Sequence, residues 1–444
     1  MMDWRRLISP KRLGMEDYKM EGSDDRSDFL RDYDRLIFSA PFRRLQNKTQ
    51  VFPLPGSVFV HNRLTHSLEV ACVGRSLGNK VSRAILQKRP ELSDSLVGEI
   101  GNIVSAACLA HDLGNPPFGH SGERAISTYF SEGKGGALRG LLTQMEWDDI
   151  VHFEGNANAF RLLTHQFNGR RKGGFALTYS TLASIVKYPY ASCYAGDKPK
   201  FGFFHTEAET FRVIADELGL IRLSAEGEPL RYCRHPLVFL VEAADDICYQ
   251  MMDIEDAYKL KILTLEETIA LLTPFIEEHK RGRLVEVLDM VVDHNEQIAY
   301  LRSKVIGILI DECVDAFMRH EEEILNGTFT DPLIKHTSER CRQAYKSCSS
   351  VAVKKIYRSR DVLDIELAGF RIINTLMELM IEAVIHPDNA YSRLLIDRVS
   401  SQYDLHAPTL YGKVQAVFDY LSGMTDVFAL DLYRKINGNS LPAV

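Results

Sequence analysis

Apolar residues recur at helical spacing along most of the chain. One stripe runs over residues 66–77, an almost wholly apolar one over residues 100–111, and a third over residues 237–249. Spacings of three and four residues place these positions on one face of a helix. The pattern therefore predicts a mainly α-helical protein.

The later part of the chain continues this pattern. It predicts further helices over residues 265–278, 283–309, 362–385 and 413–421. Strand-like patches are short by comparison. Those at Val51–Val60 and Leu223–Tyr232 are predicted to form small β-hairpins.

Together these elements predict the all-α fold class, with small β-hairpins added to a helical core. We expect an N-terminal segment at residues 1–49 that packs on the core, a helical core at residues 50–260, and a helical C-terminal region at residues 261–444. The boundary near residue 260 is soft, since helices on its two sides could share one core.

The composition is that of a globular protein. Hydrophobic residues make up 45% and charged residues 25% of the 444 positions, which is enough apolar material for a large core. The formal net charge of −7 argues against a protein that coats nucleic acid through its overall charge. A local basic groove remains compatible with that charge.

Neither a membrane span nor a disulfide framework is expected. The longest apolar run, residues 100–110, is shorter than the roughly 18–20 residues that a span requires. The N-terminus lacks the apolar segment of a signal peptide, and the eight cysteines include no Cys-x-x-Cys pair. These features predict a protein of the reducing cytoplasm with no membrane partner.

A His-Asp pair ends the apolar helix predicted at residues 100–111. Side chains of His111 and Asp112 would face inward there, and burying them is costly without a partner such as a metal ion. The next residues, 113–120, include Gly114, Pro116 and Pro117 and cannot continue a regular helix. The alternative is a capped helix end that exposes an ordinary His-Asp pair.

A second pair of polar residues lies on the helix that begins near residue 62. Arg63 and His66 are three residues apart and share a helical face. A cation beside a metal ligand suits a polyphosphate site, because it neutralises charge that the metal alone cannot. An ordinary polar helix face is the alternative for this pair taken alone.

The third set of candidates lies on the helix predicted at residues 237–253. Asp245, Tyr249 and Asp253 follow each other at four-residue spacing on a helix that the preceding apolar run indicates is buried. Core ion pairs with arginine would be the alternative explanation. Asp246 could replace Asp245 as a ligand, but Asp245 is preferred because it shares its face with Tyr249 and Asp253.

These segments together supply two imidazoles and two carboxylates, from His66, His111, Asp112 and Asp245. Mixed nitrogen and oxygen donors suit Mn, Fe, Co, Ni or Zn, and Mg where phosphate oxygens complete the ligand set. Four protein ligands leave two octahedral positions for water and a phosphate oxygen. Such a metal would lower the pKa of the water and polarise the phosphorus centre.

The order His66, then His111-Asp112, then Asp245 resembles the signature of HD-domain phosphohydrolases. Longer words resemble the bacterial dGTPases and dGTPase-like dNTP triphosphohydrolases, and they extend over nearly the whole chain. These words lie at residues 29–36, 42–52, 111–120, 153–157, 187–189, 242–249 and 424–426.

This resemblance implies an HD catalytic domain at residues 50–260. It implies metal-dependent hydrolysis of a deoxynucleoside triphosphate, with dGTP the first expectation, to deoxynucleoside and inorganic triphosphate. Mn or Mg would be the first expected metal. By position, His120 and Glu123 match the catalytic pair of the family: Glu123 would orient the imidazole while His120 moves a proton.

The resemblance also implies substrate contacts. Tyr249 would stack on the deoxyribose and leave no room for a 2′-hydroxyl, and Asp253 would hold the 3′-hydroxyl. Lys187 and Tyr188 would contact phosphate or sugar, with a structural turn before Pro189 as the alternative. The remaining matches to substrate-binding positions are Gln50, Arg63 and Asn115. Eukaryotic relatives carry histidine at the position of Asn115, so this residue indicates the bacterial branch.

Two other functions stay open at this point. One is a different HD reaction, by a phosphodiesterase or pyrophosphohydrolase acting on other nucleotides. The other is a regulator that responds to dNTPs or single-stranded DNA and in which hydrolysis is gated.

The resemblance also implies a homo-oligomer that is built from dimers, up to a hexamer. It implies a dNTP or single-stranded DNA as an allosteric partner. The basic segments Arg170–Lys172 and Lys354–Arg360 could make such contacts, although a solvated charged face is the commoner outcome.

Overall fold

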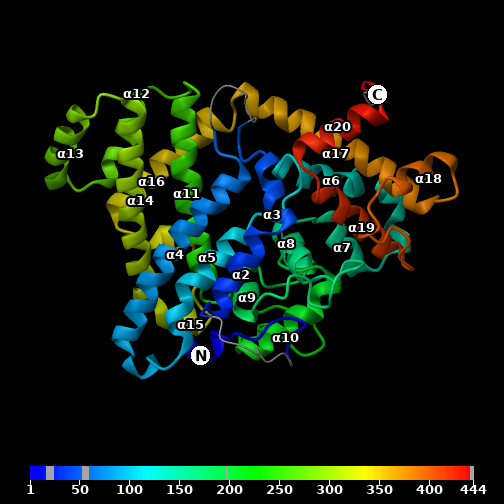
Figure 1. Cartoon of the computed structure of the whole chain (residues 1–444), viewed down its shortest axis with the longest axis horizontal. Coiled ribbons are helices and arrows are strands. Elements are labelled where there is room, and N and C mark those ends of the chain that lie inside the picture. The colour runs from blue at the N-terminus through cyan, green and yellow to red at the C-terminus, as the bar shows by residue number, and fades with distance from the viewer. Residues whose placement is uncertain (17–24, 53–59, 197–198, 441–444) are drawn as a thin grey trace.

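The computed structural model describes residues 1–16, 25–52, 60–196 and 199–440, and its architecture is helical (Figure 1). The α-helices are α1 (Trp4–Leu7), α2 (Asp28–Ile37), α3 (Ala40–Arg44), α4 (Arg63–Lys88), α5 (Ile100–Ala110), α6 (His120–Ser131), α7 (Gln144–Val151), α8 (Gly155–Thr164), α9 (Tyr179–Ile185), α10 (Ala208–Leu218), α11 (Val238–Lys259), α12 (Leu265–Leu272), α13 (Glu278–Met290), α14 (His294–Arg319), α15 (Glu321–Leu325), α16 (Glu339–Val351), α17 (Arg360–Ile385), α18 (Ala390–Asp397), α19 (Leu410–Ser422) and α20 (Asp426–Ile436).

Short 3₁₀ helices connect many of these elements. They are η1 (Leu45–Asn47), η2 (Pro90–Leu92), η3 (Leu96–Glu99), η4 (Lys134–Leu141), η5 (Ser192–Tyr194), η6 (His205–Glu207), η7 (Thr273–Phe275) and η8 (Leu333–His336). One further turn, η9 (Ala352–Ile356), is a π-helix. The all-α prediction is confirmed.

The predicted hairpins are the part of the fold that does not form as expected. The segment at residues 223–232 makes two isolated antiparallel bridges, Tyr232 with Arg222 and Arg231 with Tyr190, and no strand is assigned in it. Residues 225–228 at its tip are exposed, so little apolar surface is available to extend the pairing. Most of the other predicted hairpin, residues 53–59, lies outside the described residues.

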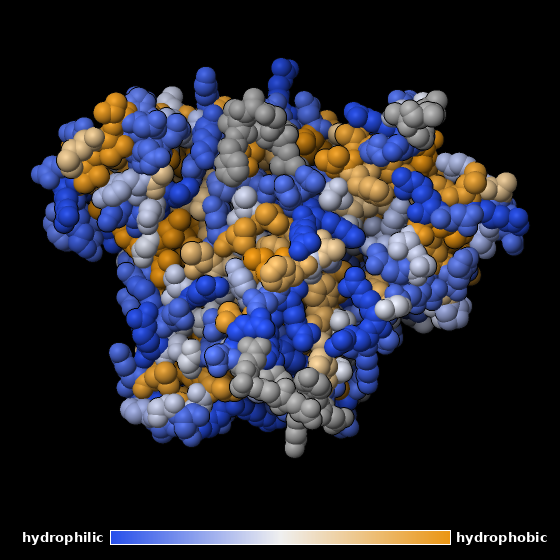
Figure 2. All heavy atoms as spheres, in the orientation of Figure 1, coloured by the Kyte–Doolittle hydropathy of each residue, from blue (hydrophilic) through white to orange (hydrophobic). Residues whose placement is uncertain are grey.

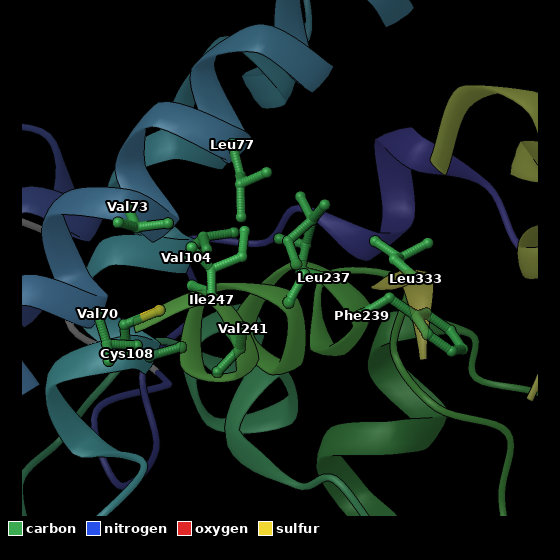
Figure 3. Close-up of a cluster of buried hydrophobic side chains, with 14 of the residues drawn as sticks. Val70, Val73, Leu77, Val104, Cys108, Leu237, Phe239, Val241, Ile247 and Leu333 are labelled. Atoms are coloured by element: carbon green, nitrogen blue, oxygen red, sulfur yellow. The ribbon is translucent and has the colours of Figure 1, made fainter. Parts of the chain in front are cut away.

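Helices α4, α5, α11 and α14 form the main core. Figure 3 shows Val70, Val73 and Leu77 of α4 meeting α5 and α11, with Val104 and Ile247 among the residues they face. All these side chains are buried. The stripes predicted at residues 66–77, 100–111 and 237–249 are therefore the faces that pack together.

Two predicted helices are interrupted where the sequence carries a stop or start signal. The helix predicted at residues 265–278 ends at Leu272, and a 3₁₀ turn containing Pro274 follows. The helix predicted at residues 283–309 is divided between α13 and α14. The Asp293 side chain caps α14 by accepting the N–H groups of Asn295 and Glu296, which satisfies donors that a helix start leaves free.

A second core joins helices from distant parts of the chain. α6 and α7 pack with α17, α19 and α20 around buried aromatic residues. The Phe418 ring centroid lies 5.8 Å from that of Phe130 and 5.1 Å from that of Phe153. Helices from both sides of residue 260 thus share this core.

The surface is mostly polar on the face shown in Figure 2, where hydrophobic residues gather in smaller patches. Within the described residues, no helix is long and apolar enough to cross a membrane.

Candidate active site

A cavity of about 570 Å³ lies where the C-terminal end of α5 and the N-terminal ends of α4 and α6 meet α11 and α17. Eleven sequence-predicted site residues line it: Gln50, Arg63, His111, Asp112, Asn115, His120, Glu123, Lys187, Tyr188, Asp245 and Tyr249. His66 and Asp253 are buried directly behind this lining. The structure therefore brings together candidates that the sequence separates by up to about 200 positions.

Local capping sets the position of His66. Asn62 and Thr65 form a reciprocal capping box at the start of α4, which fixes where this helix begins. Arg63 therefore lies in the first turn and His66 one turn later, on the buried face. In α5, apolar residues run to Ala110, so His111 and Asp112 emerge at the helix end.

The four predicted metal ligands form one cluster. Donor atoms of His66, His111 and Asp112 lie within 4.8 Å of one another. Asp245 Oδ1 lies 3.0 Å from His66 Nε2 and 3.6 Å from His111 Nε2. The neighbouring Asp246 does not line the cavity, so the geometry favours Asp245 among the two aspartates.

The donor atoms fit a divalent cation. His111 Nδ1 donates to the carbonyl oxygen of Cys108 at 2.6 Å, so in the neutral ring, the form that binds a metal, the lone pair is on Nε2. That Nε2 is buried and has no hydrogen-bond partner among the described residues. Burial acts to lower the pKa of His111, but Asp112 and Asp245 raise it to about 9. The two carboxylates thus favour positive charge at this position, which a bound cation could supply in place of the proton on His111.

Two neighbours orient the Asp112 carboxylate. Arg63 Nη1 donates to Oδ2 at 2.6 Å and Asn115 Nδ2 donates to Oδ1 at 2.5 Å. The Arg63 guanidinium is buried, and burial acts to lower its pKa; the carboxylates of Asp112 and Asp426 outweigh this and raise it. Arg63 and Asn115, predicted to contact substrate, therefore also support a ligand of the candidate metal site.

The predicted catalytic pair has the geometry of an oriented imidazole. His120 Nδ1 lies 2.7 Å from Glu123 Oε2, and Glu123 Oε1 accepts the Gly155 N–H at 2.9 Å. The hydrogen bond that His120 donates to the Glu123 carboxylate raises the pKa of His120. The His120 side chain is 76% exposed and Glu123 is buried. His120 Nε2 is thus presented to the cavity while Nδ1 is held.

Cationic side chains occupy another wall of the cavity. Lys187 Nζ lies 3.1 Å from Glu242 Oε1 and 5.8 Å from the centroid of the Tyr188 ring. Lys200 Nζ donates to Glu154 Oε1 at 2.6 Å. Sequence reasoning missed Lys200, because it lies in an irregular segment that carries no periodic signal.

Two aromatic rings form one wall of the cavity: Tyr249 on α11 and Tyr357, which packs beside it. The Tyr249 ring centroid lies 6.3 Å from that of His66 and 6.2 Å from that of Tyr357. The Tyr357 hydroxyl donates to Asp253 Oδ2 at 2.6 Å. Burial raises the pKa of Asp253 to about 8. Tyr357 was not predicted as a site residue, although the aromatic ring within the basic run at residues 354–360 could have signalled it.

Gln50 also faces the cavity. Its Oε1 atom is buried and has no hydrogen-bond partner in the described part of the chain. An unsatisfied buried acceptor costs free energy, so this atom is suited to a donor on a bound ligand.

Two family models match separate segments of the chain. The model of the HD domain family matches residues 63–153, and that of the phosphohydrolase-associated domain matches residues 335–435. A deoxyguanosinetriphosphate triphosphohydrolase-like protein of Synechocystis sp. is 38% identical, with 99% of this chain and 100% of the relative covered. A relative with the same description from Pseudomonas aeruginosa is 36% identical over the whole of both chains.

A deoxyguanosinetriphosphate triphosphohydrolase of Yersinia enterocolitica is 29% identical, with 92% of this chain and 93% of the relative covered. The HD match includes His66, His111 and Asp112 of the cluster and both residues of the His120–Glu123 pair. The chain therefore belongs to the family of deoxyguanosinetriphosphate triphosphohydrolase-like proteins, enzymes built on an HD domain.

Proposed function

We propose that this enzyme hydrolyses a deoxynucleoside triphosphate, dGTP being the first candidate, to deoxynucleoside and inorganic triphosphate. One observation carries the proposal. A single cavity exposes the His120–Glu123 pair, the cluster of His111, Asp112 and Asp245, and a wall of aromatic side chains. The names of the relatives support the same substrate class.

The cluster of His66, His111, Asp112 and Asp245 would hold a divalent metal. Mn or Mg are the first candidates, and Co, Ni, Fe or Zn also suit these donors. When bound, such an ion polarises a phosphate oxygen and lowers the pKa of the attacking water. Arg63 and Asn115 keep the Asp112 carboxylate in place for this role.

His120 is the proposed proton carrier. Glu123 holds Nδ1–H, so Nε2 faces the cavity and can transfer a proton at the leaving 5′-oxygen or the attacking water. Lys187 and Lys200 line the same cavity and would offset the charge of the phosphates.

The aromatic wall is the proposed site of the sugar. Tyr249 would pack against C2′ of the deoxyribose, where a ribose hydroxyl has no room, and Asp253 with Tyr357 would hold the 3′-hydroxyl. Tyr188 and Gln50 complete the proposed substrate contacts.

Three further proposals rest on family membership. The enzyme would be a homo-oligomer built from dimers, up to a hexamer; a dNTP or single-stranded DNA would regulate it; and it would act in the cytoplasm. Light scattering during size-exclusion chromatography tests the first of these.

The test is product identification. The protein would be incubated with each dNTP and with GTP in the presence of Mn or Mg, and the phosphate product separated by ion-exchange chromatography. We expect triphosphate from a dNTP but not from GTP, and a loss of at least about 10³-fold in Asp245→Ala because the metal site is broken. Asp246→Asn is the matched control and should stay active.

Other products would redirect the proposal. Pyrophosphate or monophosphate would contradict triphosphate release and indicate another HD nucleotide phosphohydrolase. Release of no product would favour gated hydrolysis, and the same assay with mixed dNTPs or single-stranded DNA would then decide between gating and inactivity.

A further inference from the structure

The loop that carries Gln50 and the loop that leads into His120 at the start of α6 meet at a buried carboxylate of the C-terminal region. Asp426 Oδ2 accepts the N–H of Thr49 at 2.8 Å, and Oδ1 accepts the N–H of Phe118 at 2.9 Å. The side chain is buried and does not line the cavity. Its two oxygen atoms therefore join two segments that lie 69 positions apart in the chain, at Thr49 and Phe118.

A lysine makes a second connection between the same segments. Lys48 Nζ donates to the carbonyl oxygens of Asn115 at 2.6 Å and Ser422 at 2.8 Å. Lys48 is buried as well. The C-terminal segment from Ser422 to Asp426 thus contacts both loops through side chains that water does not reach.

The backbone at Phe118 needs such support. Its φ of 62° and the φ of 56° at Gly119 lie in the left-handed region, which is unfavourable for a residue with a side chain. The strained residue is the one whose N–H Asp426 accepts. α17 also accommodates this turn: a Cβ atom at Gly369 would lie 2.5 Å from the Phe118 side chain.

Helix capping does not explain why the Asp426 carboxylate is directed at Thr49 and Phe118. The N-cap of α20 is Thr425, and its hydroxyl already accepts the N–H of Phe428. Asp426 is the first helical residue, so its charge gains some stabilisation from the helix dipole. Both of its oxygens are nevertheless directed at the two loops and not at the helix.

We infer that Asp426 is a positioning residue of the active site, which fixes the loop of Gln50 and the loop of His120 relative to each other. It does not line the cavity or contact a candidate metal ligand. It holds the backbone of Thr49 and Phe118 by hydrogen bonds, and its negative charge also acts on the buried Arg63 guanidinium. The effect on catalysis rests on the proposed function, whereas the effect on loop order does not.

The test replaces Asp426 by asparagine. Asp426→Asn keeps the shape of the side chain but retains only one acceptor oxygen, so one of the two N–H groups loses its partner. Glu266→Gln is the matched control: it removes an exposed first-turn carboxylate from α12, whose residues do not line the cavity. Asp426→Glu, which keeps both oxygens and shifts them by one methylene, is the second variant.

Amide hydrogen exchange and steady-state kinetics give independent readouts. In Asp426→Asn we expect exchange to be at least tenfold faster in peptides that cover residues 45–52 and 115–120, and unchanged in α14. We expect kcat to fall about 10–100-fold, since a misplacement of about 1 Å has effects of that size. Mn binding per chain should equal that of the wild type. Asp426→Glu should lie between wild type and Asp426→Asn, and Glu266→Gln should match wild type.

Unchanged exchange in both peptides would overturn the inference. Faster exchange throughout the chain, with Mn binding reduced in proportion to kcat, would also overturn it, because the role would then be general stability. A wild-type enzyme that releases no triphosphate would contradict the proposed function alone, and exchange would still decide whether Asp426 orders the two loops.

Discussion

Charged side chains around the cavity are held in pairs of opposite sign. Lys200 lies 2.6 Å from Glu154, and Arg63 lies 2.6 Å from Asp112. Burying a charge is costly unless a partner compensates for it, so these pairs keep ionised groups in a partly closed site. At His111, by contrast, Nε2 is buried beside two carboxylates without a hydrogen bond, and this imbalance is what a cation would correct.

His235, a buried histidine that does not line the cavity, makes the stability of the protein depend on pH. His235 Nε2 donates to the carbonyl oxygen of Leu7, and Nδ1 accepts the N–H of Leu237, both at 3.2 Å. This arrangement requires the neutral ring, and burial lowers the pKa of His235 to about 4. Because the unfolded chain binds the proton near pH 6.5, the contribution is present above that pH and is lost as the pH falls toward 4.

We therefore expect the free energy of unfolding to fall by about 2 kcal/mol more between pH 7 and pH 5 in the wild type than in His235→Gln. The glutamine keeps a donor for Leu7 but does not titrate in this range. Urea unfolding at the two pH values measures the difference. An equal loss in both proteins would show that His235 does not couple folding to protonation.

Candidate residues for the site could be chosen from the sequence where a polar or charged residue interrupts a regular apolar pattern. His111 and Asp112 follow an apolar helix, and the choice of Asp245 over Asp246 followed from the face shared with Tyr249. Lys200 and Tyr357 reach the cavity from irregular segments. Their positions depend on tertiary packing, which local periodicity does not encode.

The crossing of α4 and α5 depends on two glycines that let the helices approach closely. A Cβ atom at Gly78 would lie 2.7 Å from the Cα atom of Gly101 and 3.0 Å from its nitrogen. These are backbone atoms, so a side chain could not move them without shifting one helix. Because α4 supplies His66 and α5 leads into His111, the same contact sets the spacing of the candidate metal ligands.

Gly78→Ala should destabilise the protein by about 1–2 kcal/mol. Overpacking destabilises by roughly 1–3 kcal/mol. The higher helix propensity of alanine offsets up to about 1 kcal/mol of this loss. Gly307 in α14 is the matched control, because it is exposed and a Cβ atom there meets nothing within 4 Å. Gly307→Ala should therefore stabilise by up to about 1 kcal/mol. Urea midpoints that shift in the same direction in both variants would contradict this account.

Helices were more predictable than their ends. The predicted segments at residues 362–385 and 413–421 fall within α17 and α19. The interruption between α13 and α14 comes from the Asp293 cap, a single residue that a long periodic pattern conceals. The hairpin predicted at residues 223–232 forms isolated bridges without strands, because two short segments with an exposed tip have little apolar surface to bury.

The two segments that match family models are parts of one structure. Phe130 and Phe153, from the HD match, pack against Phe418 from the phosphohydrolase-associated match. α17 runs from the cavity, which Val362 lines, into this second core, and Figure 1 shows it crossing toward α18 and α20. The candidate active-site cavity is therefore completed by Tyr357 and α17, which lie in the phosphohydrolase-associated match.

The candidate metal ligands likewise come from separate parts of the molecule, since His66 and Asp245 are 179 positions apart. A cation bound to them would stabilise only the folded chain, by about 2.7 kcal/mol at a concentration one hundred times its Kd. We expect Tm to rise by several degrees when Mn is added to protein treated with EDTA. Asp245→Ala should lose this rise and Asp246→Asn should keep it. Because melting requires no turnover, an equal rise in Asp245→Ala would place the ion elsewhere even if the enzyme were active.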